Sequence, residues 1–261
     1  TSRSFYLSLK ELPNSIRPQV SLLYMLARTS DTIADSEQGD SSELLEKLQS
    51  YNDFSQGKST SVIDLSSLAE LQRNKSEASL LRNVGKIVSK IEEFSESDQT
   101  AIRHCLETII GGQTLDLKRF SSDEGTIHSL ESDEELDDYA YRVAGSVGEF
   151  WTRMSLDHIF DSKDEKMEEE LFEKGIRFGK ALQMINILRD IPADLSLGRC
   201  YIPSSKLADH ELTPNDLLET SSMDSFRPLY DEYLDLTDDY LTSAVQYIEM
   251  LPHWKFRLRA A

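Results

Sequence analysis

Residues 186–194 read Asn-Ile-Leu-Arg-Asp-Ile-Pro-Ala-Asp, and residues 31–35 read Asp-Thr-Ile-Ala-Asp. In a helix, side chains four residues apart lie on one face. Asp31 and Asp35 are therefore expected to point in one direction, and Asn186, Asp190 and Asp194 to form a second column. Like charges at this spacing repel, and a hard divalent cation such as Mg²⁺ relieves the repulsion while binding substrate phosphates. The two columns predict a metal-bridged diphosphate site built on helices.

An isolated pair of aspartates at this spacing is most often a solvated helix face. A chain with 47 acidic residues also contains such pairs by chance. The sequence around both motifs nevertheless favours the functional interpretation, because it is apolar. The neighbours are Tyr24, Met25, Leu26, Ala27 and Ile33 at the first motif, and Met184, Ile185, Ile187 and Leu188 at the second. We expect both motifs in buried helices, where unpaired carboxylates are costly.

Composition narrows the class of protein. The 261 residues are 39% hydrophobic, and the net charge of -19 argues against a nucleic-acid partner and against general attraction to anionic membranes. The only cysteines, Cys105 and Cys200, are expected to be small buried residues. With no disulfide pattern and no signal peptide, the chain is predicted to be cytoplasmic. No apolar run is long enough to span a bilayer.

Helical periodicity dominates the chain, and Gly and Pro are scarce, at 11 and 7. No βαβ pattern and no series of alternating strands is present. The strongest helical stretches are 15–35, 42–52, 77–93, 98–118, 134–157, 165–191 and 224–250. The connecting segments are polar, and none has the character of a domain linker. We therefore predict one all-α domain over residues 1–261.

The segment after the second motif contains both a helix stop and a cation. Gly198 and Pro203 are expected to end the helix, and Arg199 places a guanidinium near the acidic column, where it can bind phosphate oxygens. Arg28 lies three residues before the first aspartate of the other motif, and an ion pair with nearby carboxylates is an equally good interpretation. Pro192 removes a backbone donor, so the helix is expected to kink or end there.

Taken together, these residues resemble the squalene/phytoene synthase family of head-to-head prenyl transferases. Five blocks, in order along nearly the whole chain, carry the resemblance. They are Thr1 to Tyr6 (TSRSFY), Arg28 to Asp35, Gly111 to Leu117 (GGQTLDL), Tyr139 to Gly148 (YAYRVAGSVG) and Gln183 to Pro203. Each block alone is a weak indication, whereas five in the family's order are a strong one.

The resemblance implies an all-α isoprenoid-synthase helical fold with a central active-site cavity. It implies Mg²⁺ bound through Asp31, Asp35, Asn186, Asp190 and Asp194. It implies that diphosphate is held or neutralised by Ser2, Arg3, Ser4, Arg28, Arg189 and Arg199. The substrate channel would be lined by Phe5, Tyr24, Val143, Gly145 and Gln183, with Tyr201 also at the substrate. Tyr139 matches a tyrosine proposed to assist proton removal, although it could equally be a core aromatic. Gly145 and Gly148 could serve only close helix packing.

The chain departs from the family's pattern at several positions. The second motif has Ala193 where many relatives carry an acidic residue, and Pro192 is unusual there. Ala140 replaces a frequent cysteine, and Gln113 replaces a frequent methionine. These departures bear on metal geometry and substrate length more than on the fold.

The expected reaction is Mg²⁺-dependent condensation of two farnesyl diphosphates, through presqualene diphosphate, to squalene or a related product. The motif Ser30-Asp31-Thr32 lacks the doubled aspartate common in phytoene synthases, which favours the squalene-type branch. The alternatives are condensation of two geranylgeranyl diphosphates, a prenyl diphosphatase, and a non-catalytic scaffold. The need for NADPH is open, because relatives that reduce the intermediate have no Rossmann motif. The oligomeric state is also open, and a hydrophobic product suggests peripheral membrane contact during its release.

Overall fold

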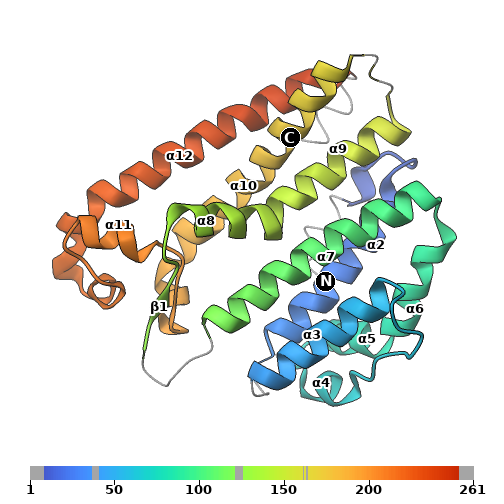
Figure 1. The fold of residues 1–261 in the computed structure, drawn as a ribbon, viewed down its shortest axis with the longest axis horizontal. Helices are drawn as coiled ribbons and strands as arrows, with labels where there is room; N and C mark the ends of the chain where they lie inside the picture. Colours follow the sequence, from blue (N-terminus) through green and yellow to red (C-terminus); the bar gives the residue numbers. More distant parts are fainter. Residues whose placement is uncertain (1–8, 37–40, 121–125, 161, 163, 253–261) are drawn as a thin grey trace. The chain divides into compact units, whose positions relative to one another are not determined.

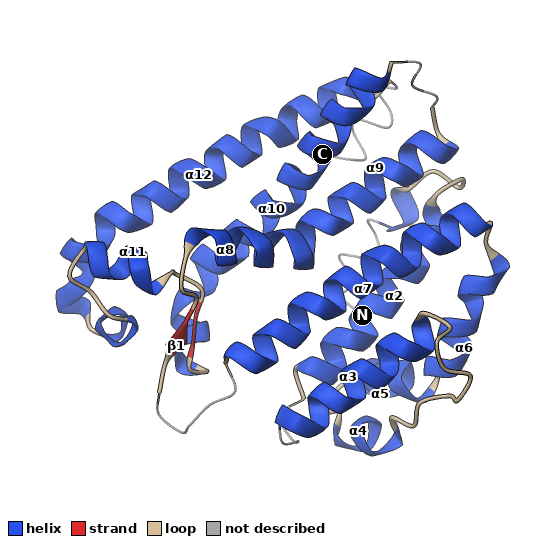
Figure 2. Ribbon diagram, in the orientation of Figure 1, coloured by secondary structure: helices blue, strands red, loops and turns tan. Residues whose placement is uncertain are grey.

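The computed structural model describes residues 9–36, 41–120, 126–160, 162, 164–252 of the chain. These residues are almost entirely helical, with one short pair of strands (Figure 2). The chain divides into two compact units. The first contains Thr1–Thr114, Phe150–Glu168 and Leu251–Ala261, and the second contains Leu115–Glu149 and Glu169–Met250.

The first unit is built around helix α2 (Arg17–Ala34), which packs against α3 (Ser41–Ser55), α5 (Lys75–Arg82) and α6 (Val84–Ser89). Its other elements are α4 (Ser66–Leu71), the 3-10 helix η1 (Lys90–Glu93) and most of α7 (Glu96–Arg119). Leu26 and Ile33 on the inner face of α2 are completely buried. The hydroxyl of the buried Tyr51 on α3 donates to the Leu26 carbonyl at 2.9 Å, which ties the two helices together.

The second unit places two long helices, α10 (Glu165–Ser196) and α12 (Met223–Met250), side by side (Figure 1). Arg177 on α10 donates to Ser243 on α12 at 2.8 Å, and Lys174 donates to Gln246 at 2.6 Å. The remaining elements of this unit are α8 (Asp133–Ala140), the π-helix η2 (Tyr141–Gly145), the start of α9 (Ser146–His158), α11 (Ser204–Asp209), and the 3-10 helices η3 (Pro214–Leu218) and η4 (Thr220–Ser222). An apolar core including Leu136, Met184 and Leu229 lies between them.

Two glycines allow the backbone around η2 to approach α10 very closely. A Cβ atom on Gly148 would lie 1.9 Å from the Gly175 carbonyl oxygen, and one on Gly179 would lie 2.2 Å from the Ala144 carbonyl oxygen. Both distances are far below a van der Waals contact. The packing interpretation of Gly148 is therefore confirmed. A Cβ on Gly145 would meet its nearest atom, on the Tyr141 side chain, at 3.1 Å.

The turn after α10 depends on Gly198, which adopts a left-handed φ of 75°. This glycine ends the helix as predicted and starts β2 (Arg199–Cys200), which pairs in parallel with β1 (His128–Ser129). Hydrogen bonds from His128 to the Gly198 carbonyl (3.0 Å) and from Leu130 to the Cys200 carbonyl (3.1 Å) anchor the segment. The pairing fixes where the next residue, Tyr201, enters the core.

The prediction of an all-α chain is confirmed, and most predicted helices are present. The stretch 77–93 was wrongly taken as one helix, because it breaks at Asn83 and tightens into η1. The stretch 134–157 contains the π-turn η2, and the short helices α4 and α11 were missed. We expected α10 to kink or end at Pro192. The helix does not end there, since it continues to Ser196. The surrounding turns hold the helix despite the missing donor.

Candidate functional site

The first acidic motif lies at the end of α2. Asp31 is recessed, with 40% of its side chain exposed, and it accepts a hydrogen bond from Gln113 on α7. Burial first, and then the charge of Asp35, raise the pKa of Asp31 to about 6, against the opposing effects of Arg28 and Gln113. Asp35 itself is exposed at the C-cap of the helix. The two carboxylates therefore interact electrostatically, as their spacing predicts.

Arg28 bridges the motif to a neighbouring helix. Its guanidinium lies 2.5 Å from the Glu77 carboxylate on α5 and 3.9 Å from Asp31. The ion-pair interpretation of Arg28 is thus present in the structure. Its predicted role toward diphosphate stays a prediction, which would require the Glu77 contact to be shared or exchanged for phosphate oxygens.

Gln113 is the departure from the family pattern that the structure explains most directly. Its amide donates to Asp31, while its own Oε1 is buried without a hydrogen-bond partner among the described residues. A methionine at this position would remove both the donor and the unpaired acceptor. Gln113 therefore favours the ionised form of Asp31.

A Gln113→Met variant is expected to raise the pKa of Asp31 above its value of about 6, because a hydrogen bond to the charged form is lost. NMR titration of the ¹³C-labelled aspartate carboxyls, with Asp31→Asn for assignment, measures the shift. Folding stability should change little, since an unpaired buried oxygen is removed along with the donor. An unchanged or lower pKa would contradict the assigned role of Gln113.

The second motif lies on α10, as predicted, but is less buried than expected. Asn186 is exposed, and Arg189 holds the half-exposed Asp190 through two contacts of 2.7 and 2.5 Å. Hydrogen bonding to Arg189 lowers the pKa of Asp190. Burial first, and then the charge of Asp190, raise the pKa of Asp194 to about 6, while Arg199 opposes the shift. Each aspartate of the column on α10 therefore has an arginine nearby.

Each acidic motif, taken by itself, is a pair of carboxylates that could hold a magnesium ion. In each motif one aspartate raises the pKa of another, so the negative charge of each pair is incompletely compensated by the protein. Among the described residues, no group of three or more His, Cys, Asp and Glu side chains is placed to hold a metal ion. Mg²⁺ usually takes one or two carboxylates and completes its shell with phosphate oxygens and water, which fits such pairs.

A buried cluster of acid and tyrosines occupies the core of the second unit. The Tyr201 hydroxyl donates to Asp116 Oδ2 at 2.7 Å, and the Tyr139 ring stacks on the Tyr201 ring with centroids 4.7 Å apart. Phe120 packs edge-on against Tyr201 at 5.2 Å. Burial raises the pKa of Asp116 to about 6, although hydrogen bonding from Tyr201 and Tyr139 opposes it. Burial, with Asp116 next, raises the pKa of Tyr139 well above 10.

Other predicted site residues are scattered through both units. Tyr24 is half-buried on α2, Gln183 is partly exposed on α10, and Gly145 is buried in η2. Val143 packs against the core of the second unit. Four further predictions fall outside the described residues, namely Ser2, Arg3, Ser4 and Phe5.

Sequence reasoning missed Asp116 as a site residue, although it lies within the quoted GGQTLDL block. Its signal was an aspartate between two leucines on a helix whose other face is apolar. It also missed the partner of Arg28, Glu77, because nothing near Glu77 in sequence marks it. Gln113 was noticed only as a departure. The importance of these three side chains depends on hydrogen bonds to residues that lie 49 to 85 positions away in sequence.

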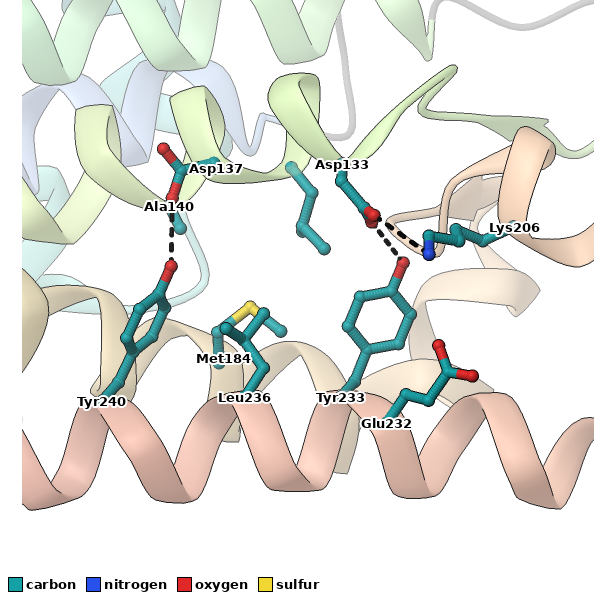
Figure 3. A pocket seen from close by; sticks show the side chains of 10 residues that line it. Asp133, Asp137, Ala140, Met184, Lys206, Glu232, Tyr233, Leu236 and Tyr240 are labelled. Carbon is teal, nitrogen blue, oxygen red and sulfur yellow. Dashed lines mark hydrogen bonds and ion pairs between the residues drawn. The ribbon is translucent and has the colours of Figure 1, made fainter.

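A separate cavity of about 320 Å³ lies between α8 and α12 (Figure 3). Tyr233 donates to Asp133 at 2.7 Å and Tyr240 donates to Asp137 at 3.1 Å, so two tyrosines of α12 reach two aspartates of α8. Lys206 lies 3.4 Å from Asp133. These polar groups satisfy one another, and their evident role is to fasten α12 to α8.

The profile of the squalene/phytoene synthase family matches residues 1–261. The chain belongs to the squalene/phytoene synthase family. It is 29% identical over 260 residues to a bifunctional lycopene cyclase/phytoene synthase of Gibberella fujikuroi, covering 96% of this chain and 42% of that protein. A protein of the same name from Blakeslea trispora is 31% identical over 223 residues, covering 80% and 32%. The chain thus spans less than half the length of these curated relatives.

Solved structures of the family share the helical architecture. TcSQS in complex with a ligand superposes with a TM-score of 0.78 at 17% identity, covering 100% of this chain and 71% of that one. A dehydrosqualene synthase in complex with a ligand gives 0.66 at 20% identity, covering 100% and 77%. The predicted isoprenoid-synthase fold is confirmed. None of the helices in the described ranges has the length and apolar character that crossing a bilayer requires.

Proposed function

We propose that this family member joins two prenyl diphosphates head to head. The observation that carries the proposal is the family match over residues 1–261, on a chain that retains both carboxylate motifs. Mg²⁺ held by these motifs would stabilise the departing diphosphate. Internal ion pairs do not neutralise either motif fully. The raised pKa values of Asp31 and Asp194 show that the negative charge of these carboxylates is not fully balanced by nearby cations.

The protein's own residues would act by charge and by exclusion of water. Arg28, Arg189 and Arg199 supply guanidinium groups near the aspartates, where they would hold diphosphate oxygens in preorganised positions. After diphosphate departs, the allylic cation would be attacked by the double bond of the second substrate. A proton must then leave to close the cyclopropane. The apolar surroundings of Tyr139 would protect such cations from water.

Different observations favour two prenyl diphosphate substrates of different chain length. The single aspartate of Ser30-Asp31-Thr32 and the TSRSF start favour farnesyl diphosphate. The names of the curated fungal relatives, at 25 to 33% identity, favour the phytoene-type reaction on geranylgeranyl diphosphate. We propose farnesyl diphosphate as the substrate and the longer diphosphate as the alternative.

Competition between the two substrates decides the length. With Mg²⁺ and equal concentrations of both diphosphates, kcat/KM for coupling is expected to favour the farnesyl substrate by about tenfold or more, since one pocket fits one length best. Mass spectrometry of the coupled diphosphates, with and without NADPH, gives the ratio and shows whether reduction follows. Preference for the geranylgeranyl substrate would replace the farnesyl proposal, and release of prenyl alcohol alone would indicate a diphosphatase.

A further inference from the structure

The two oxygens of the Asp116 carboxylate are held differently. Tyr201 donates to Oδ2 at 2.7 Å, whereas Oδ1 is buried and accepts no hydrogen bond of close geometry from the described residues. An unpaired buried acceptor is costly and is uncommon outside sites that use it. Arg119 and Arg199 act on Asp116 only through their charges. The second oxygen is therefore available to a further donor.

Tyr139 is the hydroxyl best placed to use that oxygen, because its interaction with Asp116 already lowers the pKa of the carboxyl. The residue is buried, with 7% of its surface exposed, and its ring stacks on Tyr201 at an interplanar angle of 20°. Stacking sets the Tyr139 ring beside the ring whose hydroxyl already touches the carboxylate. Phe120 also contacts Tyr201, in an edge-on arrangement. The cluster thus surrounds one carboxylate with aromatic side chains.

The protonation states of the cluster restrict what Tyr139 can do. Because burial and Asp116 raise the pKa of Tyr139 well above 10, its hydroxyl keeps its proton at neutral pH. A neutral phenol accepts a proton from carbon only if it passes its own proton on. Asp116, with a pKa of about 6, is mostly ionised at neutral pH and can receive it.

We propose that Asp116 is the acceptor, acting through Tyr139, of the proton lost when the cyclopropane closes. The inference rests on the proposed function and deepens it. In this step the carbon–hydrogen bond at C1 of the ionised substrate breaks, and its electron pair forms the bond that closes the three-membered ring. The proton goes to Tyr139 Oη as the phenolic proton goes to Asp116 Oδ1. The carboxylic acid then returns its proton to solvent as product leaves. Asp116 is thus a positioning residue that acts through the tyrosine.

The test compares Asp116→Asn with wild type on farnesyl diphosphate, unlabelled and deuterated at C1. Release of inorganic diphosphate in the first ionisation should be largely retained. Formation of the cyclopropyl diphosphate should fall about a hundredfold, the usual contribution of a positioned proton acceptor. The deuterium isotope effect on that product should increase, because proton removal becomes rate-limiting. A purely structural defect would lower the rate without increasing the isotope effect.

Asp133→Asn is the matched control. Asp133 also accepts a tyrosine hydroxyl at 2.7 Å in the same unit, from Tyr233, but lies in the separate cavity of Figure 3. Its variant should keep the wild-type rate and isotope effect. The double variant Asp116→Asn with Tyr139→Phe should be no slower than Tyr139→Phe alone, since both act on one proton path.

Asp116→Glu keeps a carboxylate and should recover part of the coupling. If the asparagine variant does not fold, the glutamate variant still tests the proposal. Equal losses in the Glu and Asn variants, or an unchanged isotope effect in folded Asp116→Asn, would overturn the inference while the wild type still couples. If the wild type releases only prenyl alcohol from either substrate, the proposed function fails as well.

Discussion

The Asp31→Asn variant is expected to lose turnover by about a thousandfold and yet to unfold at a higher temperature than the wild type at neutral pH. The loss follows from removing a carboxylate proposed to hold Mg²⁺ on diphosphate. The gain follows from the raised pKa of Asp31, which is about 6 in the folded chain. A group whose pKa is higher in the folded state destabilises the fold when it is ionised.

The sign and the pH window follow from that shift. Between the unfolded pKa of about 4 and the folded value of about 6, the folded chain binds a proton that the unfolded chain has lost. The stability advantage of Asp31→Asn should therefore be small near pH 4, grow up to about pH 6 and stay constant above it. The full shift would correspond to about 3 kcal/mol, but because 40% of the side chain is exposed, screening reduces the expected gain to about 1 kcal/mol.

Thermal unfolding followed by circular dichroism, at several pH values without metal, measures this gain. The control is Asp157→Asn, which changes an exposed aspartate of α9 and should alter neither turnover nor the pH profile. Near-normal turnover in Asp31→Asn would remove Asp31 from the proposed site. A lower melting temperature at neutral pH would contradict the electrostatic explanation of its pKa.

The Gly148→Ala variant is expected to lose about 3 kcal/mol or more of folding stability. Its Cβ would lie 1.9 Å from the Gly175 carbonyl oxygen, and a backbone oxygen cannot rotate away as a flexible side chain can. The start of α9 and the middle of α10 must therefore move apart. Alanine's higher helix propensity, worth about 1 kcal/mol, offsets only part of this cost.

Gly145→Ala is the matched comparison, because its Cβ would meet the Tyr141 side chain first, at 3.1 Å, and the closest backbone atom, the Ile176 carbonyl oxygen, only at 3.4 Å. Urea unfolding of both variants should show a much smaller loss for Gly145→Ala. Equal and small losses of folding stability in the two variants would contradict the close approach of η2 and α9 to α10.

The sequence predicted the helices well because their apolar positions recur at 3.6 residues, and that periodicity survives in the burial of α2, α10 and α12. It misplaced the breaks where tertiary packing overrides local signals. Pro192 suggested an end to α10, but the helix continues to Ser196, with Leu188 and Leu195 buried on either side of the proline. The π-turn η2 has no sequence pattern of its own, and it lies where glycines bring the backbone close to α10.

The sequence indicates some residues of the candidate site and not others, and the difference has a physical cause. Spacing within one helix identifies Asp31 with Asp35 and Asp190 with Asp194, because helical geometry is local. The residues that tune them, such as Gln113 and Glu77, come from other helices and leave no local pattern. Asp116 belongs to the same class, since its significance depends on Tyr201, which is brought to it by the strand pair β1 and β2.

The most direct test of head-to-head coupling is a label experiment on the wild-type protein. Farnesyl diphosphate carrying two deuterium atoms at C1 would be incubated with Mg²⁺ and without NADPH, and the diphosphate products analysed by mass spectrometry. Coupling through a cyclopropane predicts a product built from two substrate chains that has lost one of its four deuterium atoms. A prenyl alcohol that retains both of its deuterium atoms, with no product joining two chains from either farnesyl or geranylgeranyl diphosphate, would contradict the account.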